Sequence, residues 1–186
     1  MKSEKDKMLD GEPYWALDPE LSQERLKARN LFKKINNTEA GQEPLRIELF
    51  EELFQQKLED LWIEPPFYCD YGYNINLGKS VFFNYNCVVL DVCSVDIGEK
   101  TMFGPAVQIY TATHPLDWKE RTSGVELGKP VRIGHSCWIG GGAIINPGVT
   151  IGDRTVIGSG SVVTKDIPSD VFAAGNPCQV IRELKS

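Results

Sequence analysis

The sequence has little of what marks several common classes of protein. It contains two histidines, no Cys-x-x-Cys pair, and 20 basic against 26 acidic residues. The resulting net charge of −6 argues against nucleic acid or an anionic membrane as the main partner, because both attract basic surfaces. No apolar run approaches the roughly 20 residues that span a bilayer. The segment from Met1 to Trp15 is charged and lacks the apolar centre of a signal peptide.

A sixfold repeat occupies the chain from Val131 to Ile167. An aliphatic residue recurs at every sixth position, a turn-permissive residue follows it, and a mostly small residue comes four places after it. The aliphatic column consists of Ile133, Ile139, Ile145, Ile151, Ile157 and Val163. Neither a strand, with period 2, nor a helix, with period 3.6, predicts this spacing. It is typical of a hexapeptide β-helix, in which three units close a triangular coil around the aliphatic column.

Weaker sixfold spacing extends the solenoid back to about Tyr73, with one larger interruption. We expect the glycines after the aliphatic residues to supply backbone angles that a β-carbon would resist. Two helices are predicted before the repeat, one starting at Asp18 and Pro19 and one along an apolar stripe from Leu45 to Trp62. The predicted organisation is a helical cap segment over residues 1–63 and a β-helix over 64–186, with a loop insertion at 114–130.

The five cysteines are odd in number, so we expect free thiols and a cytoplasmic location. Cys87, Cys93 and Cys137 fall in the small inward column of the repeat, where cysteine acts as a small apolar core residue.

The two histidines occupy different kinds of position. His135 lies within a hexad at a corner, where we expect a solvent-facing side chain. His114 is the last regular residue before the insertion, and insertions in solenoids often form the binding face. Histidine is the side chain best suited to proton transfer near neutral pH. By position alone, His114 could equally be a structural residue.

Several motifs together closely resemble the hexapeptide-repeat sugar O-acetyltransferases. They are MLDGEPYWALD near the N-terminus, DYGYNI, IYTATHP around His114, INPGVTIGD, VTKDIP and AAGNP. The maltose O-acetyltransferases are nearest, with the galactoside and nodulation acetyltransferases further off. The resemblance covers nearly the whole chain and includes its helical N-terminal part.

The resemblance implies a left-handed parallel β-helix that forms a homotrimer, with active sites between subunits. It implies acetyl transfer from acetyl-CoA to a hydroxyl of a small sugar such as maltose, glucose or a galactoside, with His114 as general base and no metal required.

The resemblance also implies particular binding residues. Positions implied for the acceptor are Asp70, Asn84, Asp91 and Asp18. A turn-forming role for Asn84 and a helix-capping role for Asp18 remain alternatives. At Asp91 the local carboxylate placement differs from that of the galactoside enzyme. Positions implied for the cofactor are Gly141, Ser159, Thr164, Lys165 and Arg182. Gln179 stands where the galactoside enzyme has arginine, so phosphate contacts are expected to be weaker or supplied elsewhere.

Three other functions are weighed against sugar acetylation. The first is acetylation of another acceptor, such as an antibiotic or an amino acid hydroxyl. The second is a metal-dependent hydratase of the γ-carbonic anhydrase type, which needs three histidine ligands where one chain has two. The third is a non-catalytic β-helix such as an ice-binding protein, whose threonine ladder has no counterpart around Thr111 and Thr113.

Overall fold

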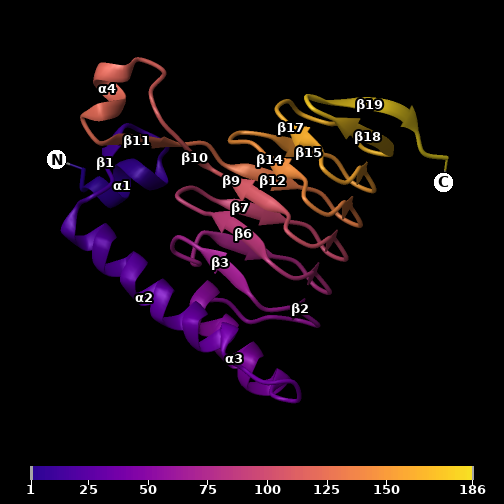
Figure 1. The fold of residues 1–186 in the computed structure, drawn as a ribbon, viewed down its shortest axis with the longest axis horizontal. Helices are drawn as coiled ribbons and strands as arrows, with labels where there is room; N and C mark the ends of the chain where they lie inside the picture. Colours follow the sequence, from indigo (N-terminus) through magenta and orange to yellow (C-terminus); the bar gives the residue numbers. More distant parts are fainter. Residues whose placement is uncertain (1, 186) are drawn as a thin grey trace.

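A computed structural model describes residues 2–185, which form a triangular β-solenoid with helices at its N-terminal end (Figure 1). Strands from successive coils stack in parallel to form three flat faces. The chain visits the faces in a fixed order, so each crossing between two faces produces an edge. The helices are α1 (Glu4–Leu9), α2 (Pro19–Asn36), α3 (Glu43–Phe54) and α4 (Trp118–Thr122). None of the helices within residues 2–185 is both long and apolar enough to cross a bilayer.

We name the faces by their outward side chains. The tryptophan face comprises β2 (Trp62–Ile63), β5 (Phe82–Phe83), β8 (Met102–Phe103), β13 (Trp138–Ile139), β16 (Val156–Ile157) and β18 (Val171–Gly175), with β19 (Cys178–Glu183) antiparallel to β18. The middle face comprises β3 (Phe67–Cys69), β6 (Cys87–Leu90), β9 (Gln108–Tyr110), β14 (Ile144–Ile145) and β17 (Val162–Val163). The polar face comprises β4 (Ile75–Leu77), β7 (Val95–Ile97), β12 (Val131–Ile133) and β15 (Thr150–Ile151).

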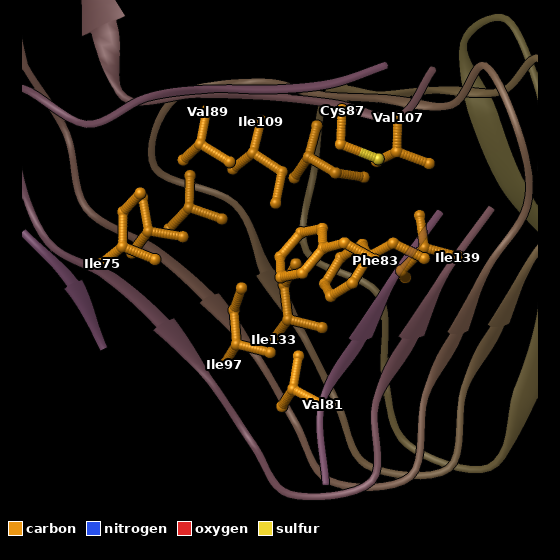
Figure 2. Close-up of a cluster of buried hydrophobic side chains, with 14 of the residues drawn as sticks. Ile75, Val81, Phe83, Cys87, Val89, Ile97, Val107, Ile109, Ile133 and Ile139 are labelled. Carbon is orange, nitrogen blue, oxygen red and sulfur yellow. The ribbon is translucent and has the colours of Figure 1, made fainter. Parts of the chain in front are cut away.

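The aliphatic and small columns of the repeat fill the solenoid axis. Side chains from all three faces point inward and meet there (Figure 2). Ile139, Ile145 and Val163 are fully buried, as are the small residues Ala143 and Ser161. This arrangement confirms the sixfold prediction. All five cysteines are buried and unpaired, which confirms the prediction of free thiols.

A phenylalanine series continues the axis into the N-terminal helices. The rings of Phe83 and Phe103 stack with centroids 4.2 Å apart, and Phe67 packs edge-on against Phe83 at 5.7 Å. Phe50 and Phe54 of α3 contact Phe67 from below, at 5.8 and 5.9 Å. Helix α3 therefore covers the open end of the first coil, while β18 and β19 lie at the other end of the solenoid (Figure 1).

The second helix ends earlier than its apolar stripe indicated. Gln55 adopts a left-handed conformation, with φ of 52°, and stops α3 after Phe54. Leu61 packs on the core from a loop, and Trp62 is already in β2, which pairs with β5. The solenoid thus begins two residues before the predicted boundary at 64. The short helix α1, capped by Ser3, was not predicted.

The insertion between β9 and β12 is an ordered arm. β10 (Ala112–Thr113) and β11 (Val125–Gly128) form a hairpin, with α4 near its tip. β1 (Tyr14–Trp15) from the N-terminal segment pairs with β11 on its other side. A second apolar cluster beneath this small sheet joins the N-terminal segment to the solenoid and consists of Met8, Tyr14, Leu21, Tyr71, Val92 and Cys93.

The glycines that follow the aliphatic column have a different role from the one expected. Gly98, Gly134 and Gly152 do not have positive φ. A β-carbon on Gly98 would lie 2.6 Å from the backbone of Gly134 and His135, and one on Gly152 would lie 2.4 Å from the nitrogen of Ser169. These glycines therefore permit close approach of successive coils. The left-handed conformation falls two residues later, for example at Ser136 and Arg154.

We expect Gly98→Ala to lower the free energy of unfolding by about 3 kcal/mol, because the added methyl group overlaps backbone that cannot move aside. Gly41→Ala is the matched control, since Gly41 has φ of 90° and open space around its β-carbon position. That variant should lose only about 1–2 kcal/mol, the cost of a left-handed alanine. Urea unfolding of both variants measures the difference, and equal losses would contradict the close-approach explanation.

Candidate active site

His114 lies directly after β10, at the edge where the chain leaves the middle face. We call this the His114 edge. Its side chain is 49% exposed, with Nδ1 3.3 Å from the carbonyl oxygen of Val125 and Nε2 3.5 Å from Oε1 of Glu126. The carbonyl oxygen of Val125 can only accept a hydrogen bond. A neutral His114 ring donates to it when the ring proton is on Nδ1. Nε2 then has a free lone pair, as a proton acceptor requires.

Glu126 is fixed by a second contact. The hydroxyl of Tyr14 donates to Oε2 of Glu126 at 2.5 Å, and the two residues face each other in the β1–β11 ladder. Tyr14 is 1% exposed, and burial followed by the hydrogen bond to Glu126 raises its pKa. The sequence did not single out Tyr14 or Glu126 as site residues, because their contact depends on β1 pairing with a non-repeating insertion.

A pocket of about 440 Å³ lies beside this group, between α2 and the His114 edge. Asp70 and Glu126 supply carboxylates to its wall, and Arg25 and Arg29 supply guanidinium groups. Burial and the charge of Glu126 raise the pKa of Asp70, while both arginines oppose the shift. Arg25 is held by bonds to the hydroxyl of Tyr71 and to a backbone carbonyl, each of 2.6 Å. The pocket has the size of a small-molecule site and offers both donors and acceptors, which suits a polyhydroxylated ligand.

Asp91 lies beneath the pocket wall. It is fully buried, and its carboxylate accepts hydrogen bonds from the backbone N–H groups of Asp70, Tyr71 and Gly72, at 2.7 to 2.9 Å. Its role in the described chain is to hold the turn that presents Asp70, and a sugar has no direct access to it. Asp91 could therefore serve an acceptor only indirectly, through this turn, and its implied acceptor role stays a prediction.

The other two acceptor candidates make local hydrogen bonds. Asp18 caps α2 by accepting from the N–H groups of Glu20 and Leu21, so the helix-capping alternative describes its contacts. Asn84 follows β5 at the edge between the tryptophan and middle faces, which we call the Asn84 edge. Its side-chain oxygen accepts from the N–H of Tyr85 at 2.8 Å, a turn-forming contact, and its side chain is half-buried.

Four of the five implied cofactor residues divide between two edges. Gly141 and Ser159 belong to successive coils of the Asn84 edge, and the N–H of Gly160 donates to the carbonyl of Gly141. Thr164 and Lys165 follow β17 at the His114 edge, and both are exposed. Arg182 lies on β19 with its guanidinium 5.8 Å from the ring of Phe172. Gln179 pairs with Ala174 in the same hairpin and is exposed.

The width of the middle face separates the two edges. At about 3.3 Å per residue, its strands and flanking residues place the edges roughly 15 Å apart. Asn84 and His114 of one chain therefore lie at opposite edges of this face.

His135 lies at a third edge, where the polar face meets the tryptophan face. It is exposed, as expected, and its Nδ1 accepts from the N–H of Glu99 at 3.2 Å. The two histidines of a chain are thus on different edges of the solenoid.

Comparison with known proteins gives two family matches. Residues 7–57 match the maltose acetyltransferase hexapeptide capping motif, and residues 130–165 match the bacterial transferase hexapeptide (six repeats). Nodulation protein L of Rhizobium leguminosarum bv. viciae is 54% identical over 96% of this chain and 94% of its own length. Galactoside O-acetyltransferase of Escherichia coli is 42% identical over 88% of this chain and 81% of its own.

Solved structures agree over the whole chain. A maltose O-acetyltransferase from Clostridium difficile 630 has a TM-score of 0.98 and 49% identity, covering 100% of this chain and 99% of that one. A galactoside acetyltransferase in complex with coenzyme A has a TM-score of 0.95 and 37% identity, covering 100% and 92%.

The fold and the repeat place the molecule among the left-handed parallel β-helix proteins built from hexapeptide repeats. More specifically, the chain belongs to the hexapeptide-repeat acetyltransferases, in the group that carries the maltose acetyltransferase capping motif. The family resemblance read from the motifs is confirmed.

The buried Asp91 gives a pH-dependent prediction. Burial raises its pKa to about 7, although the three backbone N–H donors oppose this shift. The folded value lies above the unfolded value near 4, so between these pH values the folded state holds a proton that the unfolded chain releases. The contribution of this proton to the free energy of unfolding is complete below about pH 4. It is lost as the pH rises towards 7, by up to roughly 1.4 kcal/mol per pH unit.

Asp91→Asn removes this titration, so we expect a flatter dependence of unfolding free energy on pH between about 4 and 7. Urea unfolding at intervals across that range measures the slope. Asp60→Asn is the control, because Asp60 has a side chain 69% exposed and should leave the slope unchanged. Equal slopes for the wild type and Asp91→Asn would show that Asp91 does not take up a proton in this range.

Proposed function

We propose that this acetyltransferase moves an acetyl group from acetyl-CoA to a hydroxyl group of a small sugar, with His114 as general base. The observation that carries the proposal is the position of His114, whose Nε2 lies 3.5 Å from Glu126 in the wall of a pocket of mixed carboxylates and guanidinium groups. Such a pocket can hydrogen-bond several hydroxyls of one ligand while a single hydroxyl faces the base.

In the proposed reaction, Nε2 of His114 removes the proton from the acceptor hydroxyl as its oxygen attacks the thioester carbonyl carbon. The new C–O bond gives a tetrahedral intermediate, which collapses by breaking the C–S bond. The departing sulfur takes the proton back from the imidazolium, so His114 returns to its neutral state. The products are the acetylated sugar and free CoA, and no other reactant is needed.

The same proposal assigns CoA to the residues that the family resemblance implied. Support comes from the galactoside acetyltransferase structure, which contains coenzyme A. Lys165 and Arg182 are exposed cations near the C-terminal end of an acidic protein and are suited to phosphate groups. Gln179 can donate a hydrogen bond there but brings no charge.

We further propose that the site is completed in a homotrimer. The motif residues occupy two edges of one chain, and a neighbouring copy could bring its Asn84 edge to the His114 edge of the first. Tyr68 and Leu90 point outward from the middle face between these edges, with Tyr68 42% exposed, so the face provides apolar surface for a subunit contact. The five free, buried cysteines support a cytoplasmic location, where thiols stay reduced.

We expect His114→Ala to reduce turnover by roughly 10²–10⁴-fold and to leave the fold intact, because the side chain is half exposed and caps no core. The assay is thiol release from acetyl-CoA with a panel of glucosides, galactosides and maltose. His135→Ala is the matched control and should retain wild-type turnover, since it removes the other histidine, at a different edge.

Retained activity in His114→Ala would mean that another group acts as the base. If the folded wild type releases thiol with none of the sugars but does so with an antibiotic or an amino acid hydroxyl, the acceptor class is wrong and the reaction class stands. If metal analysis and chelation show that activity requires a bound metal, the result favours the metal-dependent hydratase.

A further inference from the structure

Coenzyme A has to span part of the His114 edge in the proposed reaction. Its thioester reacts at His114, on the arm, and one of the cations assigned to its phosphate groups is Lys165, which follows β17. The arm leaves the coil of β9, and β14 separates β9 from β17 in the middle face. At about 4.8 Å per coil, the edge rises roughly 10 Å between the arm and Lys165. A molecule that reaches both points passes the intervening coil.

Lys129 lies where the arm rejoins the solenoid, and its backbone is fixed there. Its N–H donates to the carbonyl of Thr111 at 2.9 Å, in register with the β10–β11 hairpin. Glu126, which contacts Nε2 of His114, precedes Lys129 by three residues. Three residues of extended chain measure roughly 10 Å. Lys129 therefore lies on the same edge as the base, between the arm and the next coil.

The side chain of Lys129 crosses onto the next coil. A β-carbon on Gly148 would lie 3.2, 3.4 and 3.9 Å from the Cδ, Cβ and Cγ atoms of Lys129. Gly148 lies between β14 and β15, so the lysine stem covers the intervening coil at a position without a side chain of its own. Both residues are exposed. A lysine that lays its stem on a surface keeps its ammonium group in solvent, here on the path from His114 to Lys165.

The ammonium group of Lys129 has no carboxylate partner within residues 2–185. The lysines that form ion pairs in this part of the chain are Lys2, Lys5, Lys7, Lys57 and Lys79. Asp166, beside Lys165, is engaged by the N–H of Thr150 at 2.7 Å. Gln179 on β19 brings no charge. An unpaired cation with a supported stem is suited to a phosphate group.

We propose that Lys129 binds the diphosphate group of CoA, and that glycine is needed at position 148 because it leaves room for the lysine stem. This inference rests on the proposed function, which assigns the thioester to His114 and phosphate groups to Lys165 and Arg182. The diphosphate joins the pantetheine arm to the adenosine 3′-phosphate, so a cation midway along the edge faces it. Lys129 then sets the affinity for the cofactor and takes no part in proton transfer.

Calorimetric titration of the folded protein with CoA tests this contact without any acceptor. Lys129→Met keeps most of the apolar stem and removes the charge, and we expect the Kd for CoA to rise roughly threefold to tenfold. The increase should be equally large with 3′-dephospho-CoA, which retains the diphosphate. Added salt should weaken binding to the wild type more than binding to Lys129→Met, because the variant makes one fewer phosphate contact.

Gly148→Ala displaces the lysine without changing any charge. The added methyl group would lie 3.2 Å from Cδ of Lys129, so the stem has to shift. We expect the Kd for CoA to rise roughly twofold to fivefold. The double variant should match Lys129→Met alone, because Gly148 acts through the lysine.

The controls repeat each change away from the edge. Gly41→Ala matches Gly148→Ala, since Gly41 has φ of 90° against 84° and no atom within 4 Å of its β-carbon position. Lys33→Met matches Lys129→Met, since it removes an exposed lysine from the last turn of α2. Both controls should bind CoA with the wild-type Kd.

Three results would overturn the inference. An unchanged Kd in Lys129→Met would show that the lysine does not contact the cofactor. A loss seen with CoA but not with 3′-dephospho-CoA would assign Lys129 to the 3′-phosphate. A loss accompanied by a smaller oligomer on size-exclusion chromatography would make Lys129 a subunit contact. Failure of the proposed function is a separate result: a wild type that binds CoA but acetylates no sugar refutes the acceptor class, and the calorimetric comparison still decides this inference.

Discussion

Close stacking of successive coils is the constraint on which the rest of this structure depends. Each coil lies directly on the previous one, because glycine at the face-to-edge junction leaves room for the next backbone. A β-carbon on Gly98, Gly134 or Gly152 would lie within 2.6 Å of an atom in the neighbouring coil. This contact fixes the register of the three faces, and the register in turn fixes which residues share an edge.

The site is built on this framework from parts that do not repeat. The arm of β10, α4 and β11 leaves the solenoid at one edge and carries His114 and Glu126. The N-terminal segment returns to the same edge, where Tyr14 holds Glu126, and Arg25 of α2 borders the pocket. Buried Asp91 supports the turn of Asp70 from below. A regular scaffold thus provides position, and two irregular segments provide the residues of the candidate site.

The sequence predicted the parts that follow from periodicity. Columns spaced by six identify the axis residues, such as Ile139 and Ala143, because each position has the same environment in every coil. It placed the start of α2 correctly, since Asp18 and Pro19 form a local signal. It extended α3 too far, because an apolar stripe does not show where the backbone turns left-handed, as it does at Gln55.

Long-range contacts lay beyond reach of the sequence. Glu126 meets Tyr14 across more than a hundred residues, and no local pattern marks either as a partner of His114. The sequence shows the glycine column but not why glycine is needed there, since close approach between coils is visible only once they are stacked. Asp91 was placed by resemblance near the acceptor, yet burial gives it three backbone partners and a supporting role.

The central claim is that one active site needs two edges from two chains, and mixing a His114 variant with an Asn84 variant tests it most directly. His114→Ala and Asn84→Ala subunits, unfolded together and reassembled, would place an intact His114 edge beside an intact Asn84 edge. Random assembly into trimers should restore about a quarter of wild-type sites, and acetyl transfer should return in proportion. No recovery, from two variants that are each folded and assembled, would contradict the shared site and place all the catalytic residues within one chain.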